Sequence, residues 1–172
     1  MTSRQRSHPR VFPRPQQVRQ LPLQLQMAVP ADWEDRNGHV GVQHFQALFA
    51  MGAWRVLEPI GVDEDWFSSN RRSQFDLEHH LFYRSEIHAG DSVSTYNRVV
   101  GRSDRRFHGV YLVLNDSTDK LAATLEYITA GIDMGQRRMA AFPAELADGL
   151  DRLIADHRQL DWPPPLCGMM SP

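Results

Sequence analysis

The sequence predicts a single α+β domain in which a curved antiparallel sheet of about five strands wraps around one long helix. The first observation is the order of segments: one alternating segment, one helix-period segment, then four strand-like segments with short connections. The second is that each amphipathic element has one apolar face, and the helix and sheet faces must bury each other. With 172 residues and 41% hydrophobic content, the chain is long enough for one such core.

The first strand and the long helix follow from periodicity. Residues 21–29 alternate between apolar and polar side chains, as in a half-buried strand, and an acidic turn occupies residues 32–38. Apolar or small residues then recur on one helix face, at Phe45, Leu48, Phe49, Gly52 and Val56. Gly52 lies in the middle of that face, so we expect the helix backbone to approach the sheet closely there.

The second half of the domain predicts antiparallel hairpins. Residues 62–73 are expected to form a polar loop, and alternation then indicates a long strand over residues 75–84. With connections short enough for hairpins, three more strands are predicted at residues 93–101, 106–114 and 120–132. A short helix is expected after Pro143, where leucines recur at helical spacing.

Both ends of the chain are expected to lie outside the domain, which we assign to residues 21–158. Residues 1–20 are rich in arginine and proline and hold five arginines and no acid, although the whole chain has a net charge of −2. This composition is typical of a disordered or loosely draped tail. A nucleic-acid-binding arm is disfavoured because Phe12 is the only aromatic residue in that tail. Residues 159–172 are expected to form a Pro-rich, extended C-terminal tail.

Composition predicts a cytoplasmic protein without a membrane span. No apolar run approaches the roughly 18 residues of a transmembrane helix, and the N-terminus lacks the apolar stretch of a secretory signal. The single cysteine, Cys167, excludes an internal disulfide framework and fits a reducing compartment.

The most informative local feature is a carboxylate just before the long helix. Asp35 lies three residues before Gly38, and the helix is expected to begin soon afterwards. A helix N-terminus presents backbone N–H groups without intrahelical partners, and we expect those of Gly41 and Val42 to stabilise an oxyanion. The carboxylate would activate water or attack a carbonyl carbon. Its alternative interpretation is a turn or helix-capping aspartate, which helix starts favour on their own.

The same segment carries a family resemblance. Residues 35–40, Asp-Arg-Asn-Gly-His-Val, resemble the D-x-x-G-H-V/M signature of hotdog-fold acyl-CoA thioesterases of the 4-hydroxybenzoyl-CoA thioesterase type. Residues 32–39, Asp-Trp-Glu-Asp-Arg-Asn-Gly-His, are similar to the D-W-x-D-x-N-G-H-M form of the branch that includes betainyl-CoA thioesterases. The likeness extends from about residue 21 to about residue 146. Gly41 and Phe45 depart from it, because many relatives have Asn and Tyr there.

The resemblance implies the hotdog fold for the predicted sheet and helix, and thioester hydrolysis as the function. The expected reaction releases a free acid and CoA from a small acyl-CoA with a betainyl-type or aromatic acyl group, and it needs no cofactor or metal. Exposed sheet edges predict a homodimer, and a tetramer stays open. Two functions of other classes remain. One is a non-catalytic acyl-CoA-binding or interaction module, disfavoured by the presence of Asp35, and the other is an enoyl-thioester hydratase or dehydratase, for which His39 is the nearby candidate.

Further candidate residues would surround the acyl group. Asn37 and His39 flank the catalytic candidate within the motif. Glu78 could present a second carboxylate from a strand face shared with Asp76 and His80, and its alternative interpretation is a solvated strand face. Aromatic side chains that could line a pocket, or a cage for a quaternary ammonium group, are Trp33, Trp54, Trp66 and Phe67. Core packing is the alternative for Trp54.

Charged residues elsewhere carry weaker predictions. One hairpin holds a group of arginines that could contact CoA phosphates or simply be solvated, namely Arg102, Arg105 and Arg106. Glu126 lies in an apolar strand and therefore needs a buried partner, for which an arginine is the preferred choice. No metal site is expected, because the adjacent His79 and His80 point to opposite strand faces and no metal motif is present.

Overall fold

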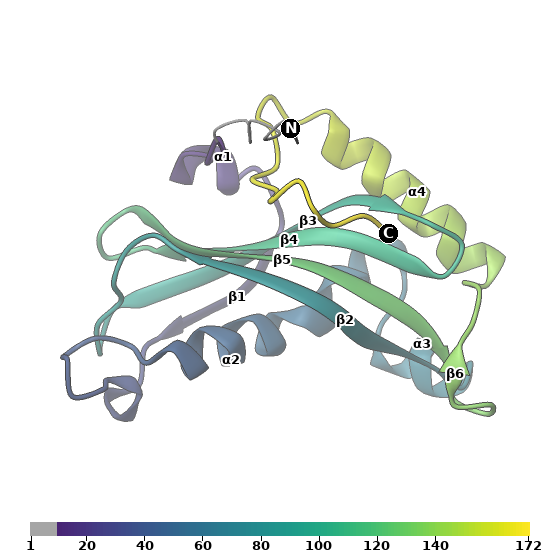
Figure 1. The fold of residues 1–172 in the computed structure, drawn as a ribbon, viewed down its shortest axis with the longest axis horizontal. Coiled ribbons are helices and arrows are strands. Elements are labelled where there is room, and N and C mark those ends of the chain that lie inside the picture. Colours follow the sequence, from purple (N-terminus) through teal and green to yellow (C-terminus); the bar gives the residue numbers. More distant parts are fainter. Residues whose placement is uncertain (1–9) are drawn as a thin grey trace, which may run out of the picture.

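The computed structural model describes residues 10–172, which form one sheet with helices on both of its faces (Figure 1). The strands of this part of the chain are β1 (Leu23–Ala28), β2 (Arg72–Tyr83), β3 (Ser92–Arg102), β4 (Arg106–Asn115), β5 (Lys120–Asp133) and β6 (Arg138–Met139). The α-helices are α1 (Pro15–Val18), α2 (Val42–Ala53), α3 (Glu64–Ser69) and α4 (Ala144–Arg158). Short 3₁₀ turns are η1 (Ala31–Trp33), η2 (Trp54–Val56) and η3 (Glu58–Ile60).

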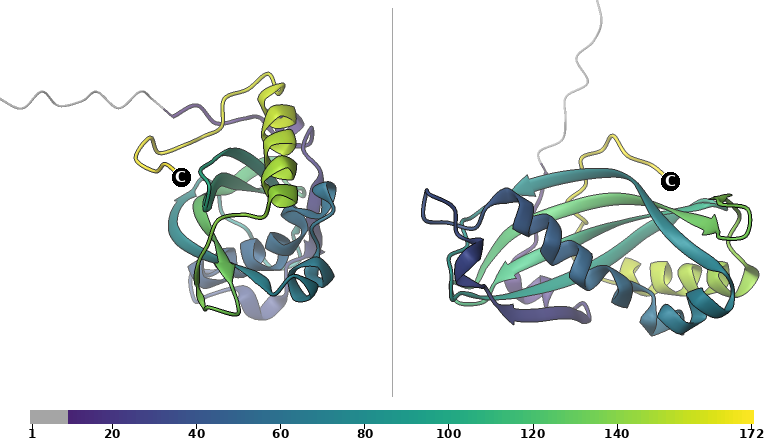
Figure 2. Two further views of the ribbon diagram at one scale, coloured as in Figure 1. Left: turned by 90° about the vertical axis from the view of Figure 1, so that its right-hand side faces the viewer. Right: turned by 90° about the horizontal axis from the view of Figure 1, so that it is seen from below.

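The sheet is antiparallel, in the order β1-β3-β4-β5-β2, with β6 paired to β5. The consecutive strands β3, β4 and β5 pair as hairpins, whereas β2 forms the edge next to β5. The sheet curls around α2, which lies along its concave face (Figure 2). The predicted architecture, a curved antiparallel sheet around one long helix, is therefore confirmed.

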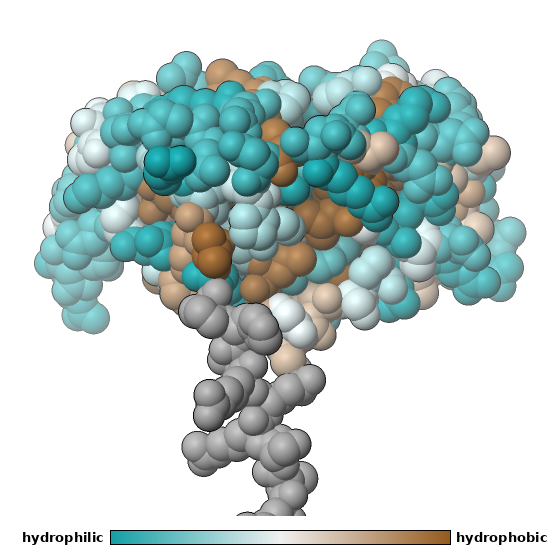
Figure 3. Space-filling view, turned by 90° about the horizontal axis from the view of Figure 1, so that it is seen from above, coloured by the Kyte–Doolittle hydropathy of each residue, from teal (hydrophilic) through white to brown (hydrophobic). Residues whose placement is uncertain are grey.

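Two hydrophobic clusters lie on opposite faces of the sheet. The concave face packs against α2, and both Leu48 of α2 and Leu125 of β5 are fully buried there. The convex face carries a second cluster around Leu112, which Val18 of α1 and Trp162 of the C-terminal segment cover. The helix α4 lies against β3 (Figure 1), and its buried leucines belong to the first cluster, the one that contains α2. Seen from above, the convex side shows hydrophobic residues between hydrophilic ones (Figure 3).

The two ends of the described chain belong to this packed body. Val18 has no exposed surface, and Trp162 is 3% exposed. The Trp162 indole N–H donates to the side-chain oxygen of Gln20 at 3.1 Å, which joins the two ends. Residues 10–20 therefore pack more firmly than the draped tail expected from composition, because apolar contacts with the sheet hold them. The predicted tail over residues 1–9 lies outside the described residues.

Two helices differ from the sequence prediction. The segment expected to be a polar loop contains α3, which Asp63 caps by accepting a hydrogen bond from the Trp66 N–H at 2.8 Å. The cap and the burial of Phe67 stabilise this short helix, which the polar composition of the segment does not predict. The terminal helix α4 has 15 residues and is longer than expected, because its buried stripe continues to His157 against β3. None of the helices in this described part of the chain combines the length and apolarity needed to cross a membrane.

A β-bulge in β2 changes which side chains face the helix. The pairing of β2 with β5 shifts between Asp76 and Glu78, which leaves Leu77 as the extra residue. Asp76 and His79 therefore lie on the concave side, whereas Glu78 and His80 lie on the convex side. The predicted shared face of Asp76 and Glu78 is wrong, because simple alternation does not include the extra residue of a bulge.

Close packing of α2 on the sheet gives a stability prediction. A Cβ atom at Gly52 would lie 2.9 Å from Thr95 Oγ1 on β3, so the expected close approach is confirmed. Gly52→Val should destabilise the protein by about 1–3 kcal/mol through overpacking, measured by urea unfolding. Ala50→Val, at an exposed position of the same helix, is the control and should cost less than about 1 kcal/mol. Equal losses in the two variants would contradict the packing argument.

Candidate active site

Asp35 lies in a tight turn between η1 and α2. Its backbone N–H donates to the His39 carbonyl at 2.9 Å, and the Gly38 N–H donates to the Asp35 carbonyl at 3.0 Å. Gly38 has a φ of +77°, a left-handed conformation that glycine adopts without steric cost. Glycine therefore occupies this position of the motif because the turn that presents the carboxylate requires it.

The Asp35 carboxylate is held by its own turn. Oδ1 accepts a hydrogen bond from the Asn37 backbone N–H at 2.7 Å, and Oδ2 accepts one from the Asn37 side-chain amide at 3.2 Å. His39 Nδ1 lies 3.4 Å from Oδ1. The backbone hydrogen bond from Asn37 is the main reason that the pKa of Asp35 lies below its ordinary value. Asp35 is therefore ionised at neutral pH, and its side chain remains 35% exposed.

A neighbouring loop, residues 85–91, supports the turn. The Val40 N–H donates to the Ile87 carbonyl at 2.8 Å, and the Ala89 N–H donates to the Glu34 carboxylate at 2.8 Å. The second contact engages the acid next to the catalytic candidate. Glu34 thus holds the loop in place, which leaves Asp35 as the carboxylate that the turn presents.

The N-terminus of α2 adjoins this turn. Gly41 is the N-cap residue, and its N–H donates to the Trp33 carbonyl at 3.0 Å. In this conformation the first of the two predicted oxyanion donors is therefore occupied. The Val42 N–H, at the first helical position, has no carbonyl one turn earlier in the helix to accept it. Val42 is consequently the better placed of the two to donate to a substrate.

An open cavity of about 370 Å³ lies beside the turn and the helix N-terminus. It is lined by residues of the turn, of α2 and of the chain leaving β2, namely His39, Val40, Val42, Phe45, Tyr83, Arg84, Ser85 and Glu86. The rings of Phe45 and Tyr83 meet edge to face, with centroids 5.1 Å apart. The volume suits a small acyl group, and the cavity lies at the open edge of the sheet.

The predicted aromatic residues do not gather in one place. Trp33 stacks on His44 near the start of α2, with ring centroids 4.8 Å apart. Trp54 and Trp66 contact Phe67 beyond the other end of α2, with centroids 6.1 and 5.4 Å from that ring. The 12 residues of α2 span about 18 Å. A cage formed by Trp33, Trp66 and Phe67 within one protomer is therefore wrong, because the length of α2 separates them.

The structure brings together an acid–histidine pair that sequence reasoning missed. His79 Nε2 lies 3.1 Å from Asp76 Oδ2, and His79 Nδ1 lies 3.1 Å from the Gln46 amide nitrogen on α2. Burial opposes ionisation of Asp76, but hydrogen bonds from His79 and Thr129 bring its pKa below the ordinary value. The alternation of residues along β2 was the only sequence signal for this pair. It failed because the bulge at Leu77 brings Asp76 and His79 onto the same face. Glu78 faces the convex side and does not reach the cavity of its own protomer.

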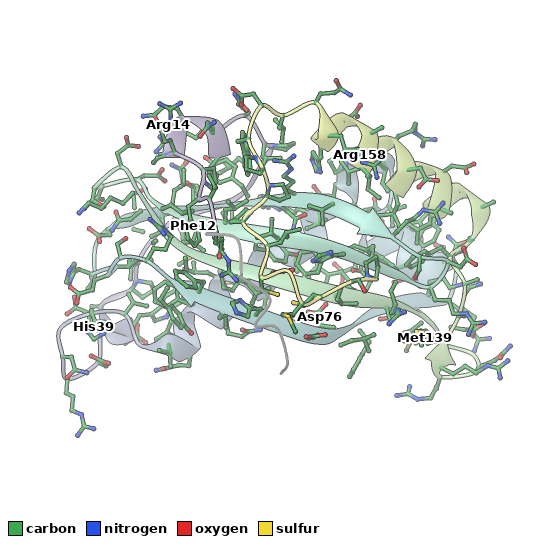
Figure 4. All side chains as sticks on the ribbon, turned by 45° about the horizontal axis from the view of Figure 1, so that its top comes forward. Phe12, Arg14, His39, Asp76, Met139 and Arg158 are labelled. Atoms are coloured by element: carbon green, nitrogen blue, oxygen red, sulfur yellow. The ribbon has the colours of Figure 1, made fainter. Side chains whose placement is uncertain are left out.

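The arginines predicted to meet CoA phosphates lie far from the cavity within one protomer. Arg102 is engaged by Asp151 in a two-point ion pair, with Nε 2.7 Å from Oδ1. Arg105 borders β6 next to Met139. Met139 and His39 mark opposite ends of the molecule (Figure 4). A phosphate-binding role for this hairpin would therefore need a second subunit.

The buried carboxylate of Glu126 has a partner other than the one predicted. His108 Nε2 lies 2.9 Å from its Oε1, and the Cys167 N–H donates to its Oε2 at 2.5 Å. The expected arginine partner is wrong, because a histidine and a backbone N–H satisfy the acid instead. Within residues 10–172, no group of three His, Cys, Asp or Glu side chains could hold a metal ion.

Comparison with known proteins bears on this geometry. An L-carnitine dehydrogenase/betainyl-CoA thioesterase of Ruegeria pomeroyi is 30% identical over 144 residues, which are 82% of this chain and 28% of that protein. A betainyl-CoA thioesterase of Pseudomonas aeruginosa is 24% identical over 132 residues, which are 77% of this chain and 83% of that protein. The chain thus spans 28% of the length of the fused relatives that it matches.

Solved structures show the same fold. A Staphylococcus aureus protein solved in complex with CoA superposes with a TM-score of 0.75 at 22% identity, over 88% of this chain and 96% of that one. The sequence model of the Thioesterase-like superfamily matches residues 29–150, which include the Asp35 turn, α2 and the strands from β2 to β5. The family predicted from the motif is therefore confirmed, and the chain belongs to the Thioesterase-like superfamily.

Proposed function

We propose that this chain is an acyl-CoA thioesterase that hydrolyses a small acyl-CoA to the free acid and CoA. The observation that carries the proposal is the ionised Asp35 carboxylate, held in a turn beside the N-terminus of α2 and a cavity of about 370 Å³. Membership of the superfamily supports the reaction, as do the names of the relatives from Ruegeria pomeroyi and Pseudomonas aeruginosa.

Asp35 is held as an ionised carboxylate, which can act as a nucleophile or as a general base, and of these two roles we propose direct attack. In the proposed route an Asp35 oxygen bonds to the thioester carbonyl carbon, the C–S bond breaks, and CoA leaves as a thiolate. Water then hydrolyses the mixed anhydride, which restores the carboxylate and releases the acid and a proton. The Val42 N–H donates to the carbonyl oxygen while that oxygen carries negative charge.

The cavity suits a small acyl group that carries a positive charge. Phe45 and Tyr83 provide aromatic surfaces, and Glu86 adds a carboxylate to the same lining. In a betainyl group the ammonium is one methylene from the carbonyl carbon, so its binding site must border the atoms that react with Asp35. The lining of this cavity meets that condition, and Phe67 beyond the far end of α2 does not. An aromatic acyl group would use the same two rings.

We further propose that the protein acts as a homodimer in the cytoplasm. The edge strand β2 has 12 residues, and its Phe75 and Leu77 are 62% and 47% exposed. The cavity lies at the end of this strand, so a second subunit paired there would help to enclose it. The convex face is covered by the chain's own ends, which disfavours a tetramer built through that face. The cytoplasmic location rests on the single cysteine.

An enoyl-thioester hydratase is the second candidate, and the Asp76–His79 pair is the observation that favours it. A histidine oriented by a carboxylate can act as a general acid or base. However, His79 lies four residues along β2 from Tyr83 of the cavity lining, or about 13 Å in an extended strand. Hydrolysis at Asp35 therefore accounts better for the position of the cavity. A non-catalytic module with this fold would bind acyl-CoA without releasing thiol.

Replacing the Asp35 carboxylate tests its catalytic role. Asp35→Asn should keep the fold and lower thioester hydrolysis on the order of 10³-fold or more, because an amide is neither a nucleophile nor a base. Thiol release from acyl-CoA measures activity, and a melting curve measures folding. Asp32→Asn, at an exposed carboxylate nearby, is the matched control and should retain activity. A folded Asp35 variant within about tenfold of the parent would refute the assignment.

The acyl-group proposal is tested with two isosteric substrates. A trimethylammonium acyl-CoA should exceed its neutral tert-butyl analogue in kcat/KM by roughly 30-fold, because a desolvated cation–π contact is worth about 2 kcal/mol. Tyr83→Leu should reduce that preference and leave hydrolysis of the neutral analogue nearly intact. Trp66→Leu, beyond the far end of α2, is the control and should keep the preference. Equal kcat/KM values for the two substrates on the parent protein would reject the cation-binding site and indicate a plain apolar pocket.

The two edge strands provide a matched test of assembly. Leu77→Lys on β2 should yield a monomer with reduced activity, because a charge would be buried where the second subunit pairs. Leu23→Lys on the opposite edge strand β1, where the leucine is 51% exposed, should leave the dimer intact. Light scattering coupled to gel filtration gives the mass of each variant. An active parent protein that is monomeric at assay concentration would exclude the dimer.

A further inference from the structure

Two arginines and two phenylalanines form a stacked cluster on the convex side of β2. The guanidinium carbon of Arg84 lies 3.9 Å from the centroid of the Phe12 ring, and that of Arg10 lies 5.1 Å from the Phe82 ring. The two rings are 5.1 Å apart. Arg10 Nε also donates to the Leu166 carbonyl at 3.2 Å. Cation–π contacts therefore fix both guanidinium groups, and we call these four residues the arginine–phenylalanine cluster.

The arginine–phenylalanine cluster borders the cavity of the candidate active site. Arg84 belongs to the cavity lining together with Tyr83 and Glu86. Phe12 lies in the same half of the molecule as His39, away from the end marked by Met139 (Figure 4). Phe12 thus contacts a residue that lines the cavity beside Asp35, which gives the described part of the N-terminal segment a place near the proposed substrate site.

The charges of the cluster are not neutralised by acids. Within residues 10–172, neither Arg10 nor Arg84 forms a salt bridge, in contrast to Arg19, which pairs with Asp116 and Asp119. A guanidinium group stacked on a ring keeps its N–H donors directed outward in its own plane. Such a fork matches the oxygen atoms of a phosphate group. The cluster therefore presents two ordered, unneutralised positive groups beside the cavity.

We propose that Arg10 and Arg84 bind the phosphate groups of the CoA part of the substrate. This inference rests on the proposed function, which places the thioester carbonyl at Asp35 and Val42. The pantetheine arm separates the thioester from the phosphates, so a phosphate site has to border the cavity but lie away from the groups that hold the carbonyl, Asp35 and Val42. The arginine–phenylalanine cluster occupies such a position, and the rings that hold it come from both β2 and the N-terminal segment.

The rival location is the hairpin around Arg105 and Arg106. In one protomer this hairpin is near β6, at the far end from the cavity. Antiparallel pairing of two β2 strands would bring the far end of the partner subunit toward the cavity. The two candidate phosphate sites differ in which subunit supplies the arginines. Arg10 and Arg84 would come from the same chain as Asp35, whereas Arg105 and Arg106 would come from the second copy.

The test compares one acyl group on two carriers, CoA and N-acetylcysteamine, which lacks phosphates. The double variant Arg10→Gln with Arg84→Gln should raise KM for the acyl-CoA about tenfold or more, with kcat nearly unchanged. It should lower kcat/KM for the N-acetylcysteamine thioester much less than for the acyl-CoA, because that thioester has no phosphate contact to lose. Arg14→Gln, at an exposed arginine of the same segment, is the matched control and should change neither value. Replacing both cluster arginines with lysine should restore part of the affinity for the acyl-CoA, since the charge returns without the planar fork.

The outcomes separate this inference from the proposed function. Equal losses on both carriers in the double variant would show a structural role and overturn the inference. So would a loss of CoA affinity confined to variants of Arg105 and Arg106. If the parent protein hydrolyses neither thioester, calorimetry with CoA and 3′-dephospho-CoA replaces the kinetic readout. Weaker binding of CoA by the double variant, with unchanged binding by Arg14→Gln, would then support the phosphate site although the proposed hydrolase activity had failed. Unchanged binding of CoA by the double variant would overturn the phosphate site.

Discussion

The packing of α2 into the concave face of the sheet is the constraint on which the site depends. The helix buries Leu48 and Phe49 against the sheet, and Gly52 allows its backbone to approach Thr95 of β3. Once the helix axis is fixed, the position of its N-terminus is fixed as well. That N-terminus carries the Val42 N–H and borders the cavity, so the hydrophobic core determines where an oxyanion can be stabilised.

The position of the carboxylate is set separately, by hydrogen bonds that involve no core residue side chain. The turn around Gly38 closes on itself, and Glu34 ties it to the loop that precedes β3. Within the turn, Asn37 donates twice to Asp35 and keeps it ionised. The turn that presents Asp35 is therefore fixed by local hydrogen bonds, and it adjoins a helix end whose position is fixed by the hydrophobic core. Motif residues such as Gly38 and Asn37 matter because they position the Asp35 carboxylate.

The sequence predicted elements well where a local pattern suffices and failed where three-dimensional position decides. Strand alternation and the helical stripe of α2 gave the architecture, and the motif gave Asp35. The helix α3 was missed because its stability comes from the Asp63 cap and one buried ring, Phe67, in a polar segment. The bulge at Leu77 exchanged the faces of Asp76 and Glu78, which no periodicity reveals. The aromatic cage failed because distance along the chain does not tell which end of α2 a ring occupies.

β2 is where the remaining proposed functions of the molecule meet. Its concave side places Tyr83 in the cavity, and its convex side places Phe82 in the arginine–phenylalanine cluster. Its edge is open for a second subunit. Adjacent residues of one strand alternate in direction, so the proposed acyl recognition, phosphate recognition and assembly would use different residues of one short stretch of chain. Variants at Tyr83, Arg84 and Leu77 should therefore have separable effects, although all three positions belong to a single short stretch of chain.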